Sequence, residues 1–128
     1  MRVLLDTHLI LWSSIMTARL SPSARRLIDD AGGGVFFSAA SLWEIGIKAQ
    51  LGRADFDVDA RRLRKGLLDD NWVEVAVSSE HAVAVADLPP IHKDPFDRLL
   101  IAQARVEGLT LLTSDARVAQ YPGDIRKV

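Results

Sequence analysis

Short apolar runs rich in β-branched and aromatic residues alternate along the chain with longer amphipathic segments. The runs predict four strands and a weaker fifth, at Val3–Leu5, Val35–Phe37, Val73–Val77, Thr110–Thr113 and Ile125–Val128. The segments between them have helical periodicity, at Leu9–Ile15, Pro22–Ala31, Ala39–Leu51, Val58–Asp69 and Pro95–Glu107. The region Glu80–Lys93 is less regular and is interpreted as a helix plus a loop. This alternation predicts an α/β fold, a three-layer α/β/α arrangement around a mostly parallel central sheet.

Local signals at the helix ends support these boundaries. Ser21 and Asp94 each precede a proline, which is the pattern of an N-cap followed by proline at the first helical position. Gly108 is placed to end the helix that begins at Pro95. The triplet Gly32–Gly34 is interpreted as a helix stop leading into a strand and not as a phosphate-binding loop.

Composition narrows the class of protein. The chain has 128 residues, 48% of them hydrophobic, which predicts one domain spanning residues 1–128. The absence of cysteine excludes disulfide scaffolds, thiolate zinc sites and cysteine nucleophiles. The apolar stretch near the N-terminus is interrupted by Asp6 and His8, and no segment reaches the ~18 apolar residues of a membrane span. We therefore expect a cytoplasmic protein without a membrane partner.

Four acidic residues fall at equivalent places in the predicted elements. Asp6 follows the first strand directly, and Asp115 follows Thr110–Thr113 after one residue. Glu44 and Asp97 lie in the first turns of two predicted helices. In a parallel sheet the carboxyl ends of the strands share one edge, where ligands of α/β folds bind. We therefore expect the four carboxylates to converge on one crevice.

Such a group of carboxylates needs a positive charge among them, because their mutual repulsion raises their pKa values. Mg²⁺ or Mn²⁺ fits this need, since both prefer oxygen ligands and keep several waters. A divalent ion held in this way suits phosphodiester hydrolysis, because it lowers the pKa of an attacking water. The spacing thus predicts an acidic metal site with hydrolytic chemistry.

Structural interpretations of the same acids remain open at this stage. Glu44 comes three residues after Ser41, as in a capping box, and Asp97 follows Asp94 as an acid favoured by the helix dipole. Asp115 could cap a short helix over residues 116–119. Asp6 is harder to explain structurally, because it interrupts an apolar stretch where an unpaired charge is costly.

Four sequence blocks resemble one known family. They are the segment Asp6–Trp12 (DTHLILW), the segment Ser38–Lys48 (SAASLWEIGIK), the segment His92–Ala104 (HKDPFDRLLIAQA), and the segment Leu111–Asp115 (LLTSD) with Tyr121 six residues later. Together, in this order and at these separations, they resemble the PIN-domain ribonucleases, specifically the VapC-type toxins of bacterial type II toxin–antitoxin pairs. The resemblance runs from residue 3 to residue 122. One departure is Val118, where an aromatic residue is common.

The resemblance implies an Mg²⁺- or Mn²⁺-dependent endoribonuclease with an RNA substrate, a cognate antitoxin partner and a homodimeric state. By position it implies that Asp6 and Asp97 hold the metal directly. Glu44 and Asp115 would complete the catalytic set or act through metal-bound water. Thr7 and Ser114 match small polar positions beside the acids, and Asp94 is assigned to helix capping instead of chemistry.

Two alternatives stay open. A degenerate PIN-like domain would bind RNA without cutting it, although all four acids are present. A receiver-like signalling domain would also bind Mg²⁺, but it requires an acid at the end of its middle strand. Here Val73–Val77 is followed by two serines, Ser78 and Ser79. Metal binding and RNA cleavage separate these alternatives.

The remaining chemistry-bearing residues are less decisive. His8 and His92 lie near the expected site and could move protons or contact phosphate, and Arg98 could pair with a carboxylate or approach phosphate. The run Arg61–Lys65 is either a solvated helix face, with Leu63, Leu67 and Leu68 facing inward, or a surface that guides RNA. The tryptophans are expected in the core or an interface; they are Trp12, Trp43 and Trp72.

The net charge of the chain supports a different conclusion about RNA binding once the four acids of the predicted metal site are counted separately. The chain carries 16 Lys and Arg against 17 Asp and Glu, which argues against RNA binding by bulk charge alone. If four acids belong to one metal site, 13 acids remain against 16 basic residues, so the rest of the molecule is mildly basic.

Overall fold

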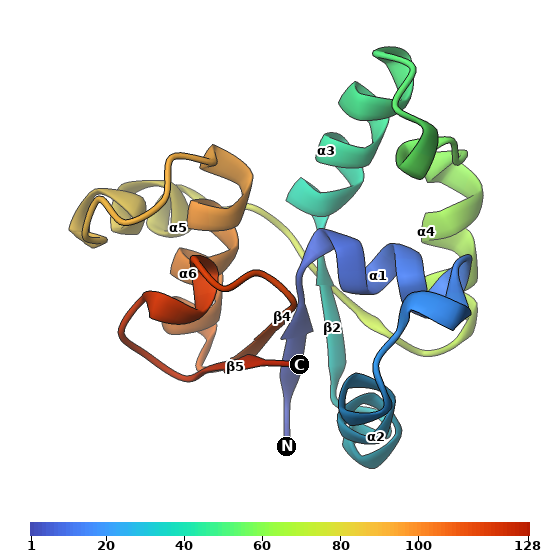
Figure 1. Cartoon of the computed structure of the whole chain (residues 1–128). Helices are drawn as coiled ribbons and strands as arrows, with labels where there is room; N and C mark the ends of the chain where they lie inside the picture. The colour runs from blue at the N-terminus through green and yellow to red at the C-terminus, as the bar shows by residue number, and fades with distance from the viewer.

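The computed structural model describes all 128 residues and contains one five-stranded sheet. Every neighbouring pair of strands is parallel, and the strand order is β3-β2-β1-β4-β5 (Figure 1). The strands are β1 Val3–Leu5, β2 Val35–Ser38, β3 Val73–Val75, β4 Thr110–Thr113 and β5 Ile125–Lys127. The predicted parallel α/β fold is confirmed, including the weak fifth strand.

Six α-helices and four short 3₁₀ helices connect the strands. The α-helices are α1 Thr7–Ser14, α2 Pro22–Ala31, α3 Ala39–Gln50, α4 Ala60–Asp69, α5 Ser79–Ala84 and α6 Pro95–Glu107. The 3₁₀ helices are η1 Thr17–Arg19, η2 Ala54–Phe56, η3 Val85–Asp87 and η4 Val118–Gln120. None of these helices is long and apolar enough to cross a membrane.

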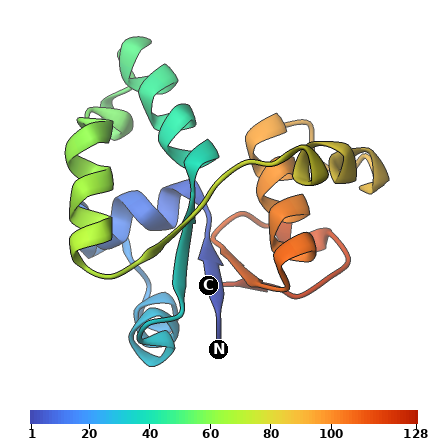
Figure 2. The ribbon, with the colours of Figure 1, turned by 180° about the vertical axis from the view of Figure 1, so that it is seen from behind.

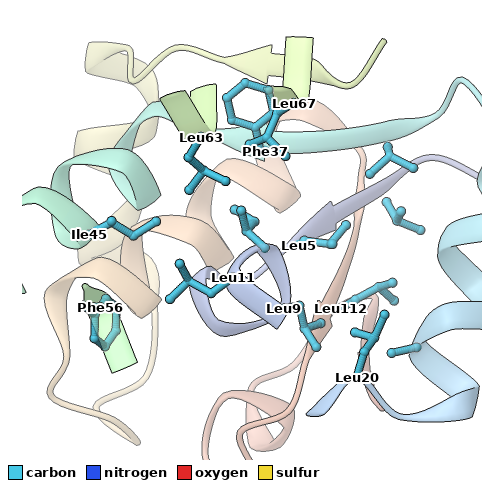
Figure 3. Close-up of a cluster of buried hydrophobic side chains, with 14 residues drawn as sticks. Leu5, Leu9, Leu11, Leu20, Phe37, Ile45, Phe56, Leu63, Leu67 and Leu112 are labelled. Atoms are coloured by element: carbon cyan, nitrogen blue, oxygen red, sulfur yellow. The ribbon is translucent and has the colours of Figure 1, made fainter. Parts of the chain in front are cut away.

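Hydrophobic residues form one core on each face of the sheet. Alternate residues of β1 point to opposite faces, so Leu5 joins one core and Leu4 the other. Helices α1 to α4 cover the first core, whose larger side chains are drawn in Figure 3, and α5 and α6 lie on the other side (Figures 1 and 2). The sheet is therefore the middle of three layers, as the alternation of elements predicts.

Several boundaries differ from the predictions for local reasons. Helix α1 begins at Thr7, because the Asp6 carboxylate accepts a hydrogen bond from the Leu9 amide and caps the helix. Helix α4 begins only at Ala60, because Asp59 caps it. The prediction that Leu68 faces inward is wrong, since its side chain is exposed.

The strand register aligns the carboxyl ends of three strands. Leu5 pairs with Leu112, and Leu4 pairs with Phe36, so the residues that follow β1, β2 and β4 lie side by side. Strand β1 connects through α1 and α2 to β2 on one side, while β4 flanks it on the other side. The strand order therefore reverses between β1 and β4. At such a topological switch point, an α/β sheet forms a crevice that binds ligands.

Candidate active site

The structure brings all four predicted acids to one cavity of about 150 Å³. No hydrophobic residue lines this cavity; its walls are Asp6, Thr7, His8, Glu44, Lys48, His92, Asp94, Asp97 and Asp115. These residues come from the ends of β1 and β4, from α1 and α3, and from the start of α6. The expected convergence at the carboxyl edge of the sheet therefore occurs.

Asp6 is fixed by hydrogen bonds to both of its carboxylate oxygens. Oδ1 accepts from the Leu9 amide at 2.9 Å, while Oδ2 accepts from the Thr113 hydroxyl at 2.6 Å and the Ser114 amide at 3.2 Å. The side chain is 5% exposed, and burial raises the pKa of its carboxyl group against the opposing effect of these hydrogen bonds. Asp6 thus caps α1, ties it to β4 and faces the cavity.

Glu44 lies inside α3 and does not cap it. The N-cap is Ser38, whose hydroxyl accepts from the Ala40 amide, so the capping-box interpretation of Ser41 and Glu44 is wrong. The Glu44 carboxylate instead accepts a 2.6 Å hydrogen bond from Thr7 and forms an ion pair with Lys48. Each Glu44 oxygen therefore has a protein partner, and Lys48 balances the charge of this carboxylate.

Asp94 and Asp97 lie at the start of α6. Asp94 Oδ1 caps the helix by accepting from the amides of Phe96 and Asp97, as predicted. Asp97 Oδ2 lies 2.8 Å from His92 Nε2, and Asp97 Oδ1 has no hydrogen-bond partner. Burial and the charge of Asp94 raise the pKa of Asp97 to about 6, although its hydrogen bond with His92 lowers it.

Asp115 combines a capping role with a place in the cavity wall. Its Oδ1 accepts from the amides of Arg117 and Val118, which stabilises the turn into η4. The helix that follows this turn is a 3₁₀ helix over Val118–Gln120. The short helix predicted over 116–119 therefore begins two residues later and ends one residue later than expected. Asp115 also lines the cavity, together with Asp6 and Asp97. The two interpretations of this acid are therefore compatible.

The cavity holds more negative than positive charge. Five carboxylates line it, and Lys48 is the one Lys or Arg among its walls. Because Lys48 is already paired with Glu44, the remaining acids face one another without a protein cation. One potential ligand atom from each of His92, Asp94 and Asp97 lies within 4.8 Å of the other two. An oxygen-rich set with excess negative charge fits Mg²⁺ or Mn²⁺.

Sequence reasoning missed two residues of this cavity. Lys48 lies four residues after Glu44 on the same helix, a spacing that signals an ion pair and could have identified it. The sequence predicts only a capping role for Asp94, which caps α6 and also lines the cavity. Thr7 and Ser114 do lie beside the acids, although Ser114 contributes its backbone amide.

Arg98 takes neither of the two roles considered for it. Its guanidinium donates to the carbonyl of Pro89 at 2.9 Å, to the Tyr121 hydroxyl at 3.0 Å and to the carbonyl of Val85 at 3.2 Å. It therefore contacts no site carboxylate and holds the segment before α6 instead. Trp43 is also not in the core: it is 65% exposed and packs edge-on against Phe96.

His8 lies at the edge of the cavity. Its ring contacts Phe56 edge-on at 5.4 Å between centroids, and its Nε2 is 3.9 Å from Asp55 Oδ2. About two fifths of its side chain is exposed, so it borders the opening and not the floor of the site.

Comparison with known proteins identifies the family. The family model described as the PIN domain matches residues 3–124. The chain belongs to the PIN domain family. Its resemblance to "Ribonuclease VapC22" from Mycobacterium tuberculosis extends over 119 residues at 30% identity, covering 93% of this chain and 91% of the relative.

Solved structures share the PIN fold at low identity. VapBC2 from Rickettsia felis, bound to a DNA fragment from its promoter, superposes with a TM-score of 0.75 at 13% identity, covering 100% of this chain and 99% of that chain. A toxin–antitoxin complex from Klebsiella pneumoniae gives a TM-score of 0.68 at 16% identity, with 98% and 96% covered. At such identities the likeness shows the fold alone. The family match and the 30% identical relative confirm the resemblance found in the sequence blocks.

Proposed function

We propose that this PIN-domain protein is an Mg²⁺- or Mn²⁺-dependent endoribonuclease that hydrolyses RNA phosphodiester bonds. The observation that carries the proposal is the convergence of Asp6, Glu44, Asp97 and Asp115 on one apolar-free cavity at the switch point of the sheet. The name of the 30% identical relative, a ribonuclease, supports the same activity. RNA is the proposed substrate, and the cytoplasm is the proposed location of the protein.

Asp6 and Asp97 are the residues we assign to the metal. Asp6 is held rigidly by three hydrogen bonds, and Asp97 keeps Oδ1 without a protein partner. When bound, the ion would lower the pKa of an attacking water and offset the negative charge that develops on the phosphate. The excess of carboxylates over protein cations in the cavity supports this assignment.

The other polar residues orient and balance the site. We assign Glu44 and Asp115 to holding water, because Lys48 already balances the charge of Glu44 and the family resemblance places Asp115 among the acids that complete the site. Lys48 supplies a positive charge at the wall of the cavity, where it can approach the phosphate of the substrate. The protein thus positions the reactants with preformed hydrogen bonds and fixed charge.

We further propose that the protein acts as the toxin of a toxin–antitoxin pair and forms a homodimer. One structural neighbour is the toxin–antitoxin complex from Klebsiella pneumoniae, and two others are VapBC2 from Rickettsia felis and VapBC from Salmonella typhimurium, which supports an antitoxin partner for this chain. Exposed apolar side chains, among them Trp43 and Val83, offer area for protein contacts.

RNA cleavage by the purified, antitoxin-free protein tests the activity. We expect cleavage with Mg²⁺ or Mn²⁺, none after chelation, and recovery when the ion is restored. Asp69→Asn is a matched control, since Asp69 is an exposed acid on α4 that pairs with Lys65. Cleavage that survives chelation would contradict the proposal, and metal binding without cleavage would favour a degenerate, RNA-binding PIN domain.

A further inference from the structure

The segment that leads into α6 is held by a buried tyrosine. Tyr121 is 3% exposed, and its hydroxyl accepts a 2.8 Å hydrogen bond from the His92 amide and lies 3.2 Å from the His92 carbonyl, to which it donates. Arg98 donates to the same hydroxyl and also binds the carbonyls of Val85 and Pro89. The backbone of His92 is therefore anchored through both its amide and its carbonyl group.

The His92 imidazole points from this anchor to Asp97. Its Nε2 lies 2.8 Å from Asp97 Oδ2, while its Nδ1 is buried and has no hydrogen-bond partner. We assign the ring proton to Nε2, because a carboxylate is an acceptor and a buried N–H at Nδ1 would lack one. The Nδ1 lone pair is closed to solvent, so neither ring nitrogen is free to face an ion.

We propose that His92, fixed by Tyr121 and Arg98, is a positioning residue that sets the direction of the Asp97 carboxylate. It occupies Oδ2 and leaves Oδ1 for a divalent ion. This proposal rests on the metal-binding role proposed for Asp97. Partners of this kind, which hold a ligand without touching the metal, typically change metal affinity about 10–100-fold when they are removed.

Mn²⁺ affinity, measured by calorimetry without RNA, tests the proposal. We expect His92→Ala to weaken binding about 10–100-fold. His92→Gln should restore most of the affinity, because its amide nitrogen can donate at the position of Nε2. Tyr121→Phe should weaken binding in the same direction by a smaller factor, since it frees the segment but keeps the imidazole.

Thr110→Val is the matched control for lost stability. Thr110 is a buried residue of β4 whose hydroxyl donates to Asp124, and neither residue lines the cavity. This variant should lower the melting temperature and leave Mn²⁺ affinity unchanged. Circular dichroism of each variant checks that it is folded, so a general loss of structure cannot imitate a positioning effect.

A spectroscopic readout tests the hydrogen bond without metal. A long-range ¹H–¹⁵N spectrum of the metal-free protein at neutral pH should show His92 as the Nε2–H tautomer, with this proton slowed in exchange. In Tyr121→Phe the exchange should become faster. An Nδ1–H tautomer overturns the proposal, because His92 could then not donate to Asp97.

Two affinity results would also overturn it. Wild-type affinity in His92→Ala would show that His92 does not act on Asp97, and failure of His92→Gln to recover would show that His92 ligates the ion itself. These failures differ from failure of the proposed activity. A protein that binds Mn²⁺ as expected but cuts no RNA would refute the ribonuclease, while unaltered binding in an active His92→Ala would refute only the role of His92.

Discussion

Two clusters of polar groups include side chains of α6, and they differ in how completely they are satisfied. In the first, on α5 and α6, His81 Nδ1 accepts from the Ser78 amide and Nε2 bonds to Glu107. Gln103 accepts from the Ser38 hydroxyl at 2.6 Å and donates toward the Ala76 carbonyl. The one carboxylate of this cluster is part-exposed and paired.

The second cluster is the acidic cavity, and its groups are not balanced. Asp94, Asp97 and Asp115 each keep an oxygen without a protein partner. Lys48, the one lysine of the cavity, forms an ion pair with Glu44. Burial is shared by both clusters, so it does not distinguish them. The two clusters differ in unpaired negative charge, which is costly to bury unless a ligand compensates for it. The comparison shows that the unsatisfied cluster is the one to assign to function.

The largest expected effect comes from removing a charge of the unbalanced cluster. Asp97→Asn keeps the size of the side chain and removes its charge, so it should weaken Mn²⁺ binding and reduce RNA cleavage by about 10²–10³-fold. Initial cleavage rates at saturating Mg²⁺ measure this loss. Rates equal to those of the control Asp69→Asn would contradict the assignment. Asp97→Asn is a cleaner test than Asp6→Asn, because Asp6 also caps α1 and holds β4.

The same substitution should stabilise the metal-free protein at neutral pH. The folded-state pKa of Asp97, about 6, exceeds its ordinary value of 3.8, so the folded protein binds more protons than the unfolded chain between these values. Its free energy of unfolding therefore falls as pH rises from about 4 through 6, by as much as about 3 kcal/mol.

Urea unfolding in a chelator measures this effect. Asp97→Asn should exceed the wild type in stability at pH 7.5 and lose that advantage below pH 4, and Mn²⁺ should stabilise only the wild type. Equal stabilities at pH 7.5 would show that the cavity tolerates its charge without an ion.

Breaking the balanced cluster should cost stability and spare the metal site. Gln103→Ala leaves the Ser38 hydroxyl and the Ala76 carbonyl without their partner, which should lower the free energy of unfolding by about 1–3 kcal/mol. Mn²⁺ affinity of the folded variant should remain that of the wild type. A large loss of affinity would instead mean that the two clusters are coupled through Ser38 and α3.

The sequence predicts most of the fold and the convergence of the acids for a physical reason. Strands rich in β-branched residues alternate with capped helices, and parallel strands end at one edge, so Asp6 and Asp115 had to be neighbours. The β3 end was placed two residues late, since Ala76 and Val77 continue the apolar pattern after pairing has stopped.

Other features depend on contacts that a sequence does not display. Ser41 and Glu44 match a capping box, but Ser38 caps the helix first, so Glu44 is free to turn to the cavity. Arg98 binds carbonyls of the irregular region 85–89, whose path the pattern leaves open. The sequence predicts Trp43 in the core or in an interface, and its large exposed fraction in the structure excludes the core.

The smallest effect is expected from the basic face of α4. Arg64 and Lys65 are already paired with Glu74 and Asp69, so only Arg61 and Arg62 of this run are open to phosphate. Arg61→Ala with Arg62→Ala should weaken RNA binding a few-fold and lower the salt dependence of log K by about 1–2. Lys65→Ala is the control. An unchanged slope in the double variant would assign this face to solvent.

The central claim is that the acidic cavity holds a divalent ion through Asp6 and Asp97. Anomalous diffraction from crystals soaked in Mn²⁺ tests it most directly, because the ion is located without reference to activity. The account predicts a Mn²⁺ peak in the cavity, bonded to carboxylate oxygens of Asp6 and Asp97, and no such peak in Asp97→Asn. An empty cavity in wild-type crystals at saturating Mn²⁺, or an ion bound elsewhere, would contradict it.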